Sequence, residues 1–143
     1  MSSQNQQNQQ SQQNIILVVE DDDLTYNLVE KMLLNAHFEV LRAKDGARAV
    51  DEAAKNHPSL ILMDLRLPKI DGWHAAKQIQ AIKQLKDTPI LAMTAEASFE
   101  DEHDAFEAGC HDYIRKPIEQ TDLIDKIHQL LSPFKKLEKT KAI

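Results

Sequence analysis

The sequence predicts an α/β fold, in which one five-stranded parallel sheet carries helices on both faces. Short apolar runs alternate along the chain with longer segments in which apolar residues recur at helical spacing. The runs Ile15–Val19 and Leu60–Met63 are apolar at every position, which is typical of strands covered on both sides. Because parallel strands are joined by right-handed crossovers, few windings are possible, and the common one has the strand order 2-1-3-4-5.

Five segments are expected to form the strands. In chain order they are Ile15–Val19, Phe38–Leu41, Leu60–Asp64, Pro89–Thr94 and Tyr113–Lys116. Pro58 and Pro68 flank the third strand, and Pro117 follows the fifth, since proline has no N–H to donate to a neighbouring strand. The third strand ends in the carboxylate of Asp64, at the edge of the sheet where open α/β folds bind their ligands.

Five helices are expected to alternate with these strands. Asp23 is the predicted N-cap of the first, Asp45-Gly46 and Asp71-Gly72 begin the next two, and the fourth, 97–108, ends before Gly109. The residues expected to face inward are, helix by helix, Leu24, Leu28, Val29, Met32, Leu33 and Ala36; Ala47, Val50 and Ala54; Ala76, Ile79 and Ile82; and Leu123, Ile124, Ile127, Leu130 and Leu131.

Composition limits the class of protein. The chain has 143 residues, of which 42% are hydrophobic and 28% charged, as expected for one soluble globular domain. A formal net charge of −6 argues against a nucleic-acid surface. The single cysteine, Cys110, excludes an internal disulfide, and no apolar stretch approaches the roughly 18 residues of a membrane span. With no signal peptide, a cytoplasmic location is expected.

Both ends of the chain differ from its middle. Residues 1–14 are almost wholly Ser, Gln and Asn and have no apolar surface to bury, so a disordered tail is expected there. Residues 15–132 are expected to form the domain, and 133–143 a flexible Lys-rich tail.

Polar residues follow several strands and should meet at one edge of the sheet. In the order 2-1-3-4-5 the first strand neighbours the third, so Glu20, Asp21 and Asp64 converge, and Thr94 and Lys116 reach the same edge. Three close carboxylates need a proton or a cation among them, and hard oxygen ligands with room for water suit Mg²⁺.

A metal, a lysine and a hydroxyl around one carboxylate indicate phosphoryl transfer, with Asp64 as the nucleophile that becomes an aspartyl phosphate. No residue obviously activates a second substrate. The phosphorylated protein itself is therefore the expected product, and no enzyme with a separate turnover substrate is predicted.

Five motifs in register resemble the receiver domain of two-component response regulators. They are Val18-Val19-Glu20-Asp21-Asp22, Leu62-Met63-Asp64-Leu65-Arg66-Leu67-Pro68, Asp71-Gly72, Met93-Thr94-Ala95 and Tyr113-Ile114-Arg115-Lys116-Pro117. The resemblance covers about Ile15 to Leu131 and implies a CheY-like single domain with the flavodoxin-like (βα)5 three-layer sandwich.

The resemblance implies how the site works. Asp64 is similar to the phospho-acceptor that takes its phosphoryl group from a phosphohistidine of a histidine kinase or a histidine phosphotransfer protein. Asp21 and Asp64 match ligands of Mg²⁺, for which Mn²⁺ can substitute. The backbone carbonyl of Arg66 matches a third ligand, and Glu20 acts mainly through water.

The resemblance also implies a switch. Lys116 pairs with the phosphoryl group, and its bond to Pro117 is expected to be cis. Thr94 is similar to the hydroxyl that moves to a phosphoryl oxygen, and Tyr113 to the aromatic that follows it inward. That movement repacks the surface formed by the fourth helix, the fifth strand and the last helix. Simple packing is the alternative role for Tyr113.

Two rim positions are particular to this sequence. Arg66 lies two residues after Asp64, and Glu96 two after Thr94. We hypothesise that they approach across the opening and influence attack of water on the phosphorylated form. The alternative is two solvated charges, because exposed pairs contribute only about 0–1 kcal/mol.

Two other functions are compatible with the motifs: a docking module that is never phosphorylated, and an aspartyl-phosphate phosphatase of the haloacid dehalogenase type. The phosphatase needs an acid two residues beyond its nucleophile, where this chain has Arg66. The output is expected to be protein docking, with no direct nucleic-acid contact and no membrane insertion. The chain is expected to be a monomer, with dimerisation upon phosphorylation as the alternative, and a stand-alone regulator, a phosphorelay shuttle and a segment of a hybrid kinase all stay open.

Overall fold

The computed structural model describes residues 14–66, 72–95, 106–107 and 109–132. It contains a five-stranded parallel sheet with the order β2-β1-β3-β4-β5, so the predicted fold class and strand order are confirmed. The strands are β1 (Ile15–Val19), β2 (Glu39–Ala43), β3 (Leu60–Asp64), β4 (Ile90–Thr94) and β5 (Asp112–Arg115).

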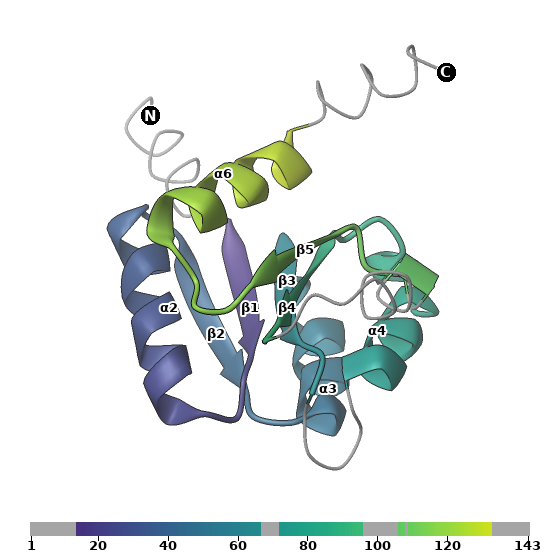
Figure 1. Cartoon of the computed structure of the whole chain (residues 1–143). Helices are drawn as coiled ribbons and strands as arrows, with labels where there is room; N and C mark the ends of the chain where they lie inside the picture. The colour runs from purple at the N-terminus through teal and green to yellow at the C-terminus, as the bar shows by residue number, and fades with distance from the viewer. Residues whose placement is uncertain (1–13, 67–71, 96–105, 108, 133–143) are drawn as a thin grey trace.

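Helices cover both faces of this sheet (Figure 1). They are α2 (Asp23–Asn35), α3 (Gly46–Asn56), α4 (Gly72–Gln80), the 3-10 helix η1 (Lys83–Leu85) and α6 (Gln120–Leu131). One hydrophobic core joins the sheet to α2 and α6, and a second joins it to α3, α4 and η1. Most of the expected helix 97–108 lies outside the described residues.

Successive side chains of β1 point to opposite faces of the sheet, so the strand contributes to both cores. Leu17 and Val19 belong to the core under α3 and α4, whereas Ile16 and Val18 belong to the core under α2 and α6. All four side chains are fully buried, and each buried side chain of this size contributes about 1.5–3 kcal/mol. The strand therefore has no face that could be polar, which explains its uninterrupted apolar run.

Aspartates cap two helices, one of them displaced from its expected position. Asp45 accepts a hydrogen bond from the Arg48 N–H at 2.8 Å and caps α3, which begins at Gly46. For α2 the cap is Asp22, which accepts from the Thr25 N–H at 2.9 Å, and the prediction of Asp23 is wrong by one residue. Asp22 has the extended backbone that a cap requires, whereas Asp23 already lies in the helix.

The inward face of α2 differs from the expected stripe. Leu24 and Leu28 are 80% and 50% exposed. The buried residues of the helix are Tyr26, Val29, Met32 and Leu33. A spacing of four residues advances about 40° further than one helical turn at each step, so a stripe at that spacing leaves the core face. The two exposed leucines are therefore available at the surface.

The inward face of α3 is also shifted. Ala49 and Ala53 are buried and Val50 is partly buried, but Ala47 and Ala54, which were expected inside, are exposed. Alanines lie on several sides of this helix, so hydrophobicity alone does not define its phase. In contrast, the expected inward residues Ala76 and Ile79 of α4, and Leu123 and Ile127 of α6, are fully buried.

Candidate functional site

Polar side chains are buried at the carboxyl edge of the sheet. Val19 is paired with Met63, so Glu20 and Asp64 follow neighbouring strands to the same place. In the described part of the chain the buried polar or charged residues are Glu20, Asp64 and Thr94, which are 1%, 6% and 5% exposed. Buried polar groups are costly unless they are paired, so their concentration at one edge indicates a site.

Lys116 reaches this edge from the segment after β5. Its Nζ lies 2.8 Å from Glu20 Oε1 and 3.1 Å from Asp64 Oδ2. The contact with Asp64 is a hydrogen bond, and that with Glu20 is an ion pair. Burial lowers the pKa of Lys116, but the two carboxylates outweigh it and raise the pKa overall, so the lysine is charged.

One lysine does not compensate both carboxylates. Burial raises the pKa of Glu20 to about 7, with Lys116 opposing and the nearby Asp64 adding to the rise. The backbone N–H of Asp22 donates to Glu20 Oε2 at 3.2 Å, but Glu20 Oε1 accepts no hydrogen bond from any described residue. The cleft therefore holds an excess of negative charge close to neutral pH.

A divalent cation fits this excess. Glu20, Asp21 and Asp64 each offer a carboxylate oxygen, and these oxygens lie within 4.8 Å of one another. Asp21 is exposed, so the group is open to water on one side. Hard oxygen donors, an excess of buried negative charge and access for water match the preferences of Mg²⁺.

The structure also places the other predicted site residues. The Arg66 N–H donates to Asp64 Oδ1 at 2.9 Å, its side chain is exposed, and the role of its carbonyl stays a prediction. Tyr113 is partly buried against the core under α3 and α4, and the Lys116-Pro117 peptide is cis. Glu96 lies outside the described residues, so the expected approach of Arg66 and Glu96 stays a prediction.

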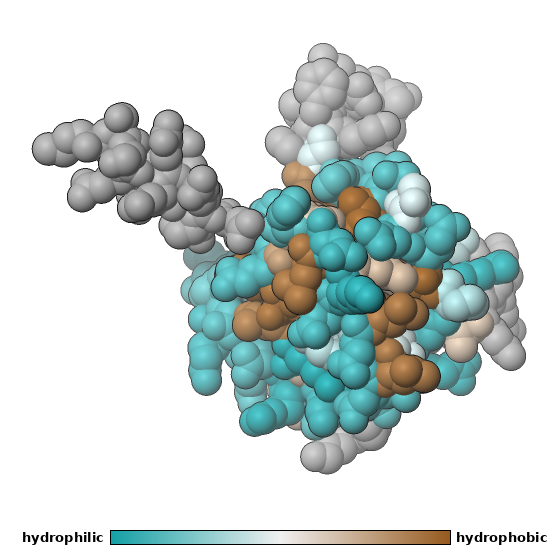
Figure 2. Space-filling view, turned by 90° about the vertical axis from the view of Figure 1, so that its left-hand side faces the viewer, coloured by the Kyte–Doolittle hydropathy of each residue, from teal (hydrophilic) through white to brown (hydrophobic). Residues whose placement is uncertain are grey.

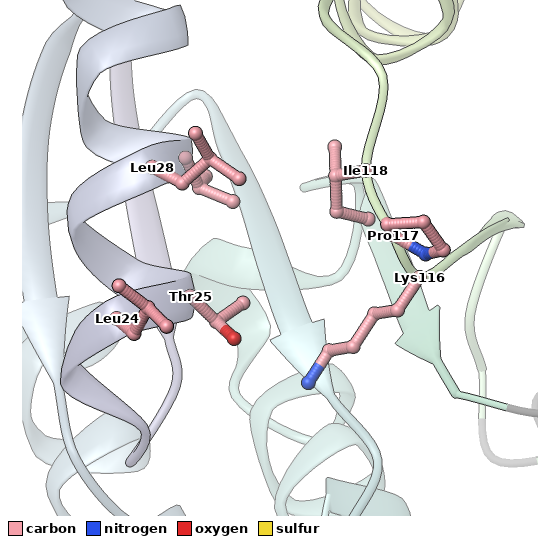
Figure 3. A pocket seen from close by; sticks show the side chains of 7 residues that line it. Leu24, Thr25, Leu28, Lys116, Pro117 and Ile118 are labelled. Carbon is pink, nitrogen blue, oxygen red and sulfur yellow. The ribbon is translucent and has the colours of Figure 1, made fainter.

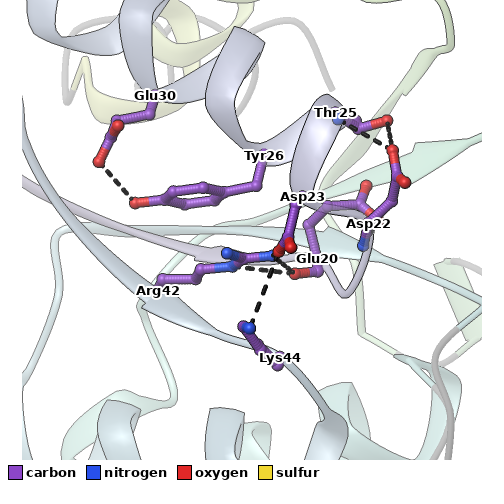
Figure 4. Close-up of polar contacts among 8 residues, drawn as sticks. All are labelled: Glu20, Asp22, Asp23, Thr25, Tyr26, Glu30, Arg42 and Lys44. Atoms are coloured by element: carbon purple, nitrogen blue, oxygen red, sulfur yellow. Dashed lines mark hydrogen bonds and ion pairs between the residues drawn. The ribbon is translucent and has the colours of Figure 1, made fainter.

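Two residues that contact the site were given no role in it by the sequence analysis. Gly72 begins α4 against the backbone of Asp64, and only its position after Asp71 hinted at a role. Arg42, on β2, donates to the backbone carbonyl of Glu20 (Figure 4). Arg42 lies just beyond the expected second strand, Phe38–Leu41, whereas the observed strand continues to Ala43.

A shallow hollow lies beside Lys116 (Figure 3). Its volume is about 150 Å³, and it is lined by Leu24, Thr25, Leu28, Val29, Lys116, Pro117 and Ile118. Viewed from the α2 side, hydrophobic groups interrupt the hydrophilic surface of the protein (Figure 2). The exposed Leu24 and Leu28 make this surface apolar directly next to the site.

The fold and the acidic edge with its lysine define a receiver-type α/β protein, and comparison with known proteins shows the family. The chain belongs to the response regulator receiver domain family, whose model matches residues 16–128. It is 34% identical to the polar-differentiation response regulator DivK of Brucella ovis over 116 residues, which cover 81% of this chain and 94% of that protein. The predicted resemblance is therefore confirmed.

Solved structures agree. The receiver domain of sensor histidine kinase PA1611 from Pseudomonas aeruginosa, with a magnesium ion coordinated in its active-site cleft, has a TM-score of 0.79 at 34% identity, covering 83% of this chain and 98% of that one. A chain of the co-crystal structure of the Saccharomyces cerevisiae histidine phosphotransfer protein Ypd1 and the receiver domain of its downstream response regulator Ssk1 has a TM-score of 0.77 at 30% identity, covering 82% and 88%. No described helix of this protein is both long and apolar enough to span a membrane.

Proposed function

We propose that this chain is a phosphorylatable receiver, in which Asp64 accepts a phosphoryl group from a phosphohistidine in the presence of Mg²⁺. The observation that carries this proposal is the position of Lys116 Nζ between Glu20 and Asp64, next to the three convergent carboxylates. A carboxylate oxygen of Asp64 forms the new P–O bond while the P–N bond breaks, and the imidazole nitrogen keeps that electron pair.

The residues at the acidic edge have different roles in this phosphoryl transfer. The Arg66 N–H and Lys116 fix the two oxygens of Asp64, which orients the nucleophile. Lys116 also supplies a positive charge for the incoming phosphoryl oxygens, and Thr94 supplies a hydroxyl at the same edge. Asp21, Asp64 and the carbonyl of Arg66 would hold Mg²⁺, which would supply positive charge against the phosphoryl oxygens. The chain assists its own phosphorylation and dephosphorylation and turns over no separate substrate.

The two other candidate functions are less consistent with this site. A docking module that is never phosphorylated has no need of an uncompensated buried carboxylate beside a charged lysine, which costs stability. A phosphatase would need an acid at the position of Arg66, whose side chain is exposed on the rim. We place the receiver in the cytoplasm, acting through a downstream protein.

Phosphorylation of Asp64 is tested by mass. Incubation of the wild-type protein with acetyl phosphate and Mg²⁺ is expected to add one phosphoryl group, measured by intact-protein mass spectrometry. Asp64→Asn is expected to show no gain, because an amide is not a nucleophile for this transfer. Asp51→Asn, an exposed position on α3, serves as the matched control and should be modified like wild type. A mass gain in Asp64→Asn, or none in wild type, would refute the proposal.

The apolar surface beside Lys116 suits a protein donor rather than a small one. Leu24 lies 80% exposed at the start of α2 and lines the hollow next to the lysine. Leu24→Asp is expected to slow transfer from a radiolabelled histidine phosphotransfer protein by about tenfold, because the substitution would bury an unpaired charge in an apolar contact.

The same variant separates docking from chemistry. An acid in the first turn of a helix is favourable, so Leu24→Asp should fold and should react with acetyl phosphate at the wild-type rate. Leu34→Asp, which alters an exposed leucine near the other end of α2, is the control. Equal transfer rates for the two variants would remove Leu24 from the donor interface.

A further inference from the structure

Arg42 contacts the acidic edge of the sheet through its backbone (Figure 4), whereas Lys116 contacts its carboxylates. It lies on β2 opposite Val18, and its side chain is 20% exposed. Its guanidinium donates two hydrogen bonds to the backbone carbonyl of Glu20, from Nε at 3.3 Å and from Nη2 at 3.1 Å. Among the described residues, Arg42 donates to no other backbone carbonyl.

The guanidinium itself is held on further sides. Nη2 donates to Asp23 Oδ1 at 2.8 Å, and Cζ lies 4.2 Å from the centre of the Tyr26 ring. The Tyr26 hydroxyl donates to Glu30 at 2.9 Å, which holds the far end of the tyrosine side chain in place. Hydrogen bonding to Arg42 lowers the pKa of Asp23, which keeps that carboxylate charged. A planar group fixed by stacking and hydrogen bonds at once is a rigid reference point.

The backbone of Glu20 is therefore hydrogen-bonded at both its N–H and its carbonyl. Its N–H donates to the carbonyl of Ala43 at 3.0 Å, and its carbonyl accepts from Arg42. That carbonyl belongs to the peptide unit that carries the N–H of Asp21, so its orientation sets where the next residue begins. Asp21 is exposed, and among the described residues no hydrogen bond or ion pair holds its side chain.

We propose that Arg42 is a positioning residue, which fixes the Glu20 carbonyl and thereby holds the Asp21 carboxylate where it can share a divalent cation with Asp64. This inference rests on the proposed function, because it concerns the same cation site. Outer contacts that orient a ligand commonly change metal affinity about 10–100-fold when they are removed.

Removal of Arg42 should change the affinity for Mg²⁺ in opposite directions, depending on whether the residue acts through its charge or through its position. If Arg42 acted only through its positive charge, its removal would make the cleft more negative and would strengthen cation binding. If it acts through position, its removal weakens binding although the field becomes more favourable. Lys44 provides the matched control, because it carries the same charge, lies 3.7 Å from Asp23, is 65% exposed and has no contact with the Glu20 carbonyl.

The test is calorimetric titration of the full chain with Mg²⁺ alone, using wild type, Arg42→Met, Arg42→Lys and Lys44→Met. Arg42→Met is expected to bind Mg²⁺ about tenfold more weakly than wild type, and Arg42→Lys to be weakened as well, since an ammonium lacks the planar fork. Lys44→Met should bind as well as wild type or better. In metal-free protein, the amide resonance of Asp21 should shift in both Arg42 variants and stay in place in Lys44→Met.

Each outcome of the titration either supports or contradicts the proposed role of Arg42. If Arg42→Met binds Mg²⁺ as tightly as wild type or more tightly, the positioning role is wrong. If Arg42→Met does not fold, the same conclusion follows from unchanged Mg²⁺ binding by Arg42→Lys. Failure of wild type itself to bind Mg²⁺ overturns the proposed function instead, so the two failures are distinguishable.

Discussion

Gly72→Ala is expected to destabilise the protein by about 3 kcal/mol, the upper end of the usual cost of overpacking. A β-carbon at this position would lie 2.4 Å from the carbonyl oxygen of Asp64 and 2.5 Å from Cα of Leu65. Both are backbone atoms at the end of β3, which is hydrogen-bonded to β4, so neither can move as the tip of a side chain could. The Gly72 N–H also donates to the Leu65 carbonyl at 3.2 Å, which draws the two segments together.

The same clash is expected to reduce phosphorylation. Relief of the contact requires the start of α4 and the end of β3 to separate, and the end of β3 carries Asp64. A displacement of the nucleophile slows transfer even in molecules that remain folded. Urea unfolding and acetyl phosphate labelling of the same variant measure the two effects.

Gly109→Ala provides the comparison. Gly109 has a φ of 99°, and its added β-carbon would lie 2.8 Å from Cγ of Gln80, a flexible side chain that can move away. We expect a cost of about 1–2 kcal/mol from the positive φ, with labelling of Asp64 unchanged. A smaller loss of stability in Gly72→Ala than in Gly109→Ala would contradict the close backbone approach.

The sheet was predictable because its signal is redundant. All residues of β1 are apolar, and so are all residues of β3 before Asp64. Parallel strands that are joined by crossover helices also have few possible orders. The convergence of Glu20 with Asp64 follows from that order alone. Once the sheet is known, the acidic edge needs no further information.

Helix faces and indirect contacts were less predictable. In α2 the leucines at 24 and 28 have the hydrophobicity of core residues, and only the packing of the helix against the sheet shows that they are exposed. Arg42 contacts a backbone carbonyl, which has no signature in the sequence. Gly72 was predicted only to begin a helix with Asp71, because a helix start and a close backbone approach can select the same residue.

Glu20→Gln is expected to make the metal-free protein more stable, by about 1–3 kcal/mol near pH 8. Burial raises the pKa of Glu20 from 4.5 to about 7, which means that the folded protein favours the neutral carboxyl. Folding then gains stability from this group below pH 4.5, and that gain is lost as the pH rises to about 7 and above. Glutamine has no charge to lose, and Lys116 keeps Asp64 as its partner.

The advantage of the variant therefore depends on pH and on the metal. Urea unfolding in a chelator should show equal stabilities for wild type and Glu20→Gln near pH 4.5, with a difference that grows up to about pH 7. Excess Mg²⁺ near pH 8 should stabilise wild type more than the variant, because binding to the folded state adds to its stability. A variant that is less stable than wild type in chelator near pH 8 would mean that Lys116 fully compensates Glu20, and the charge excess that makes this edge a cation site would not exist.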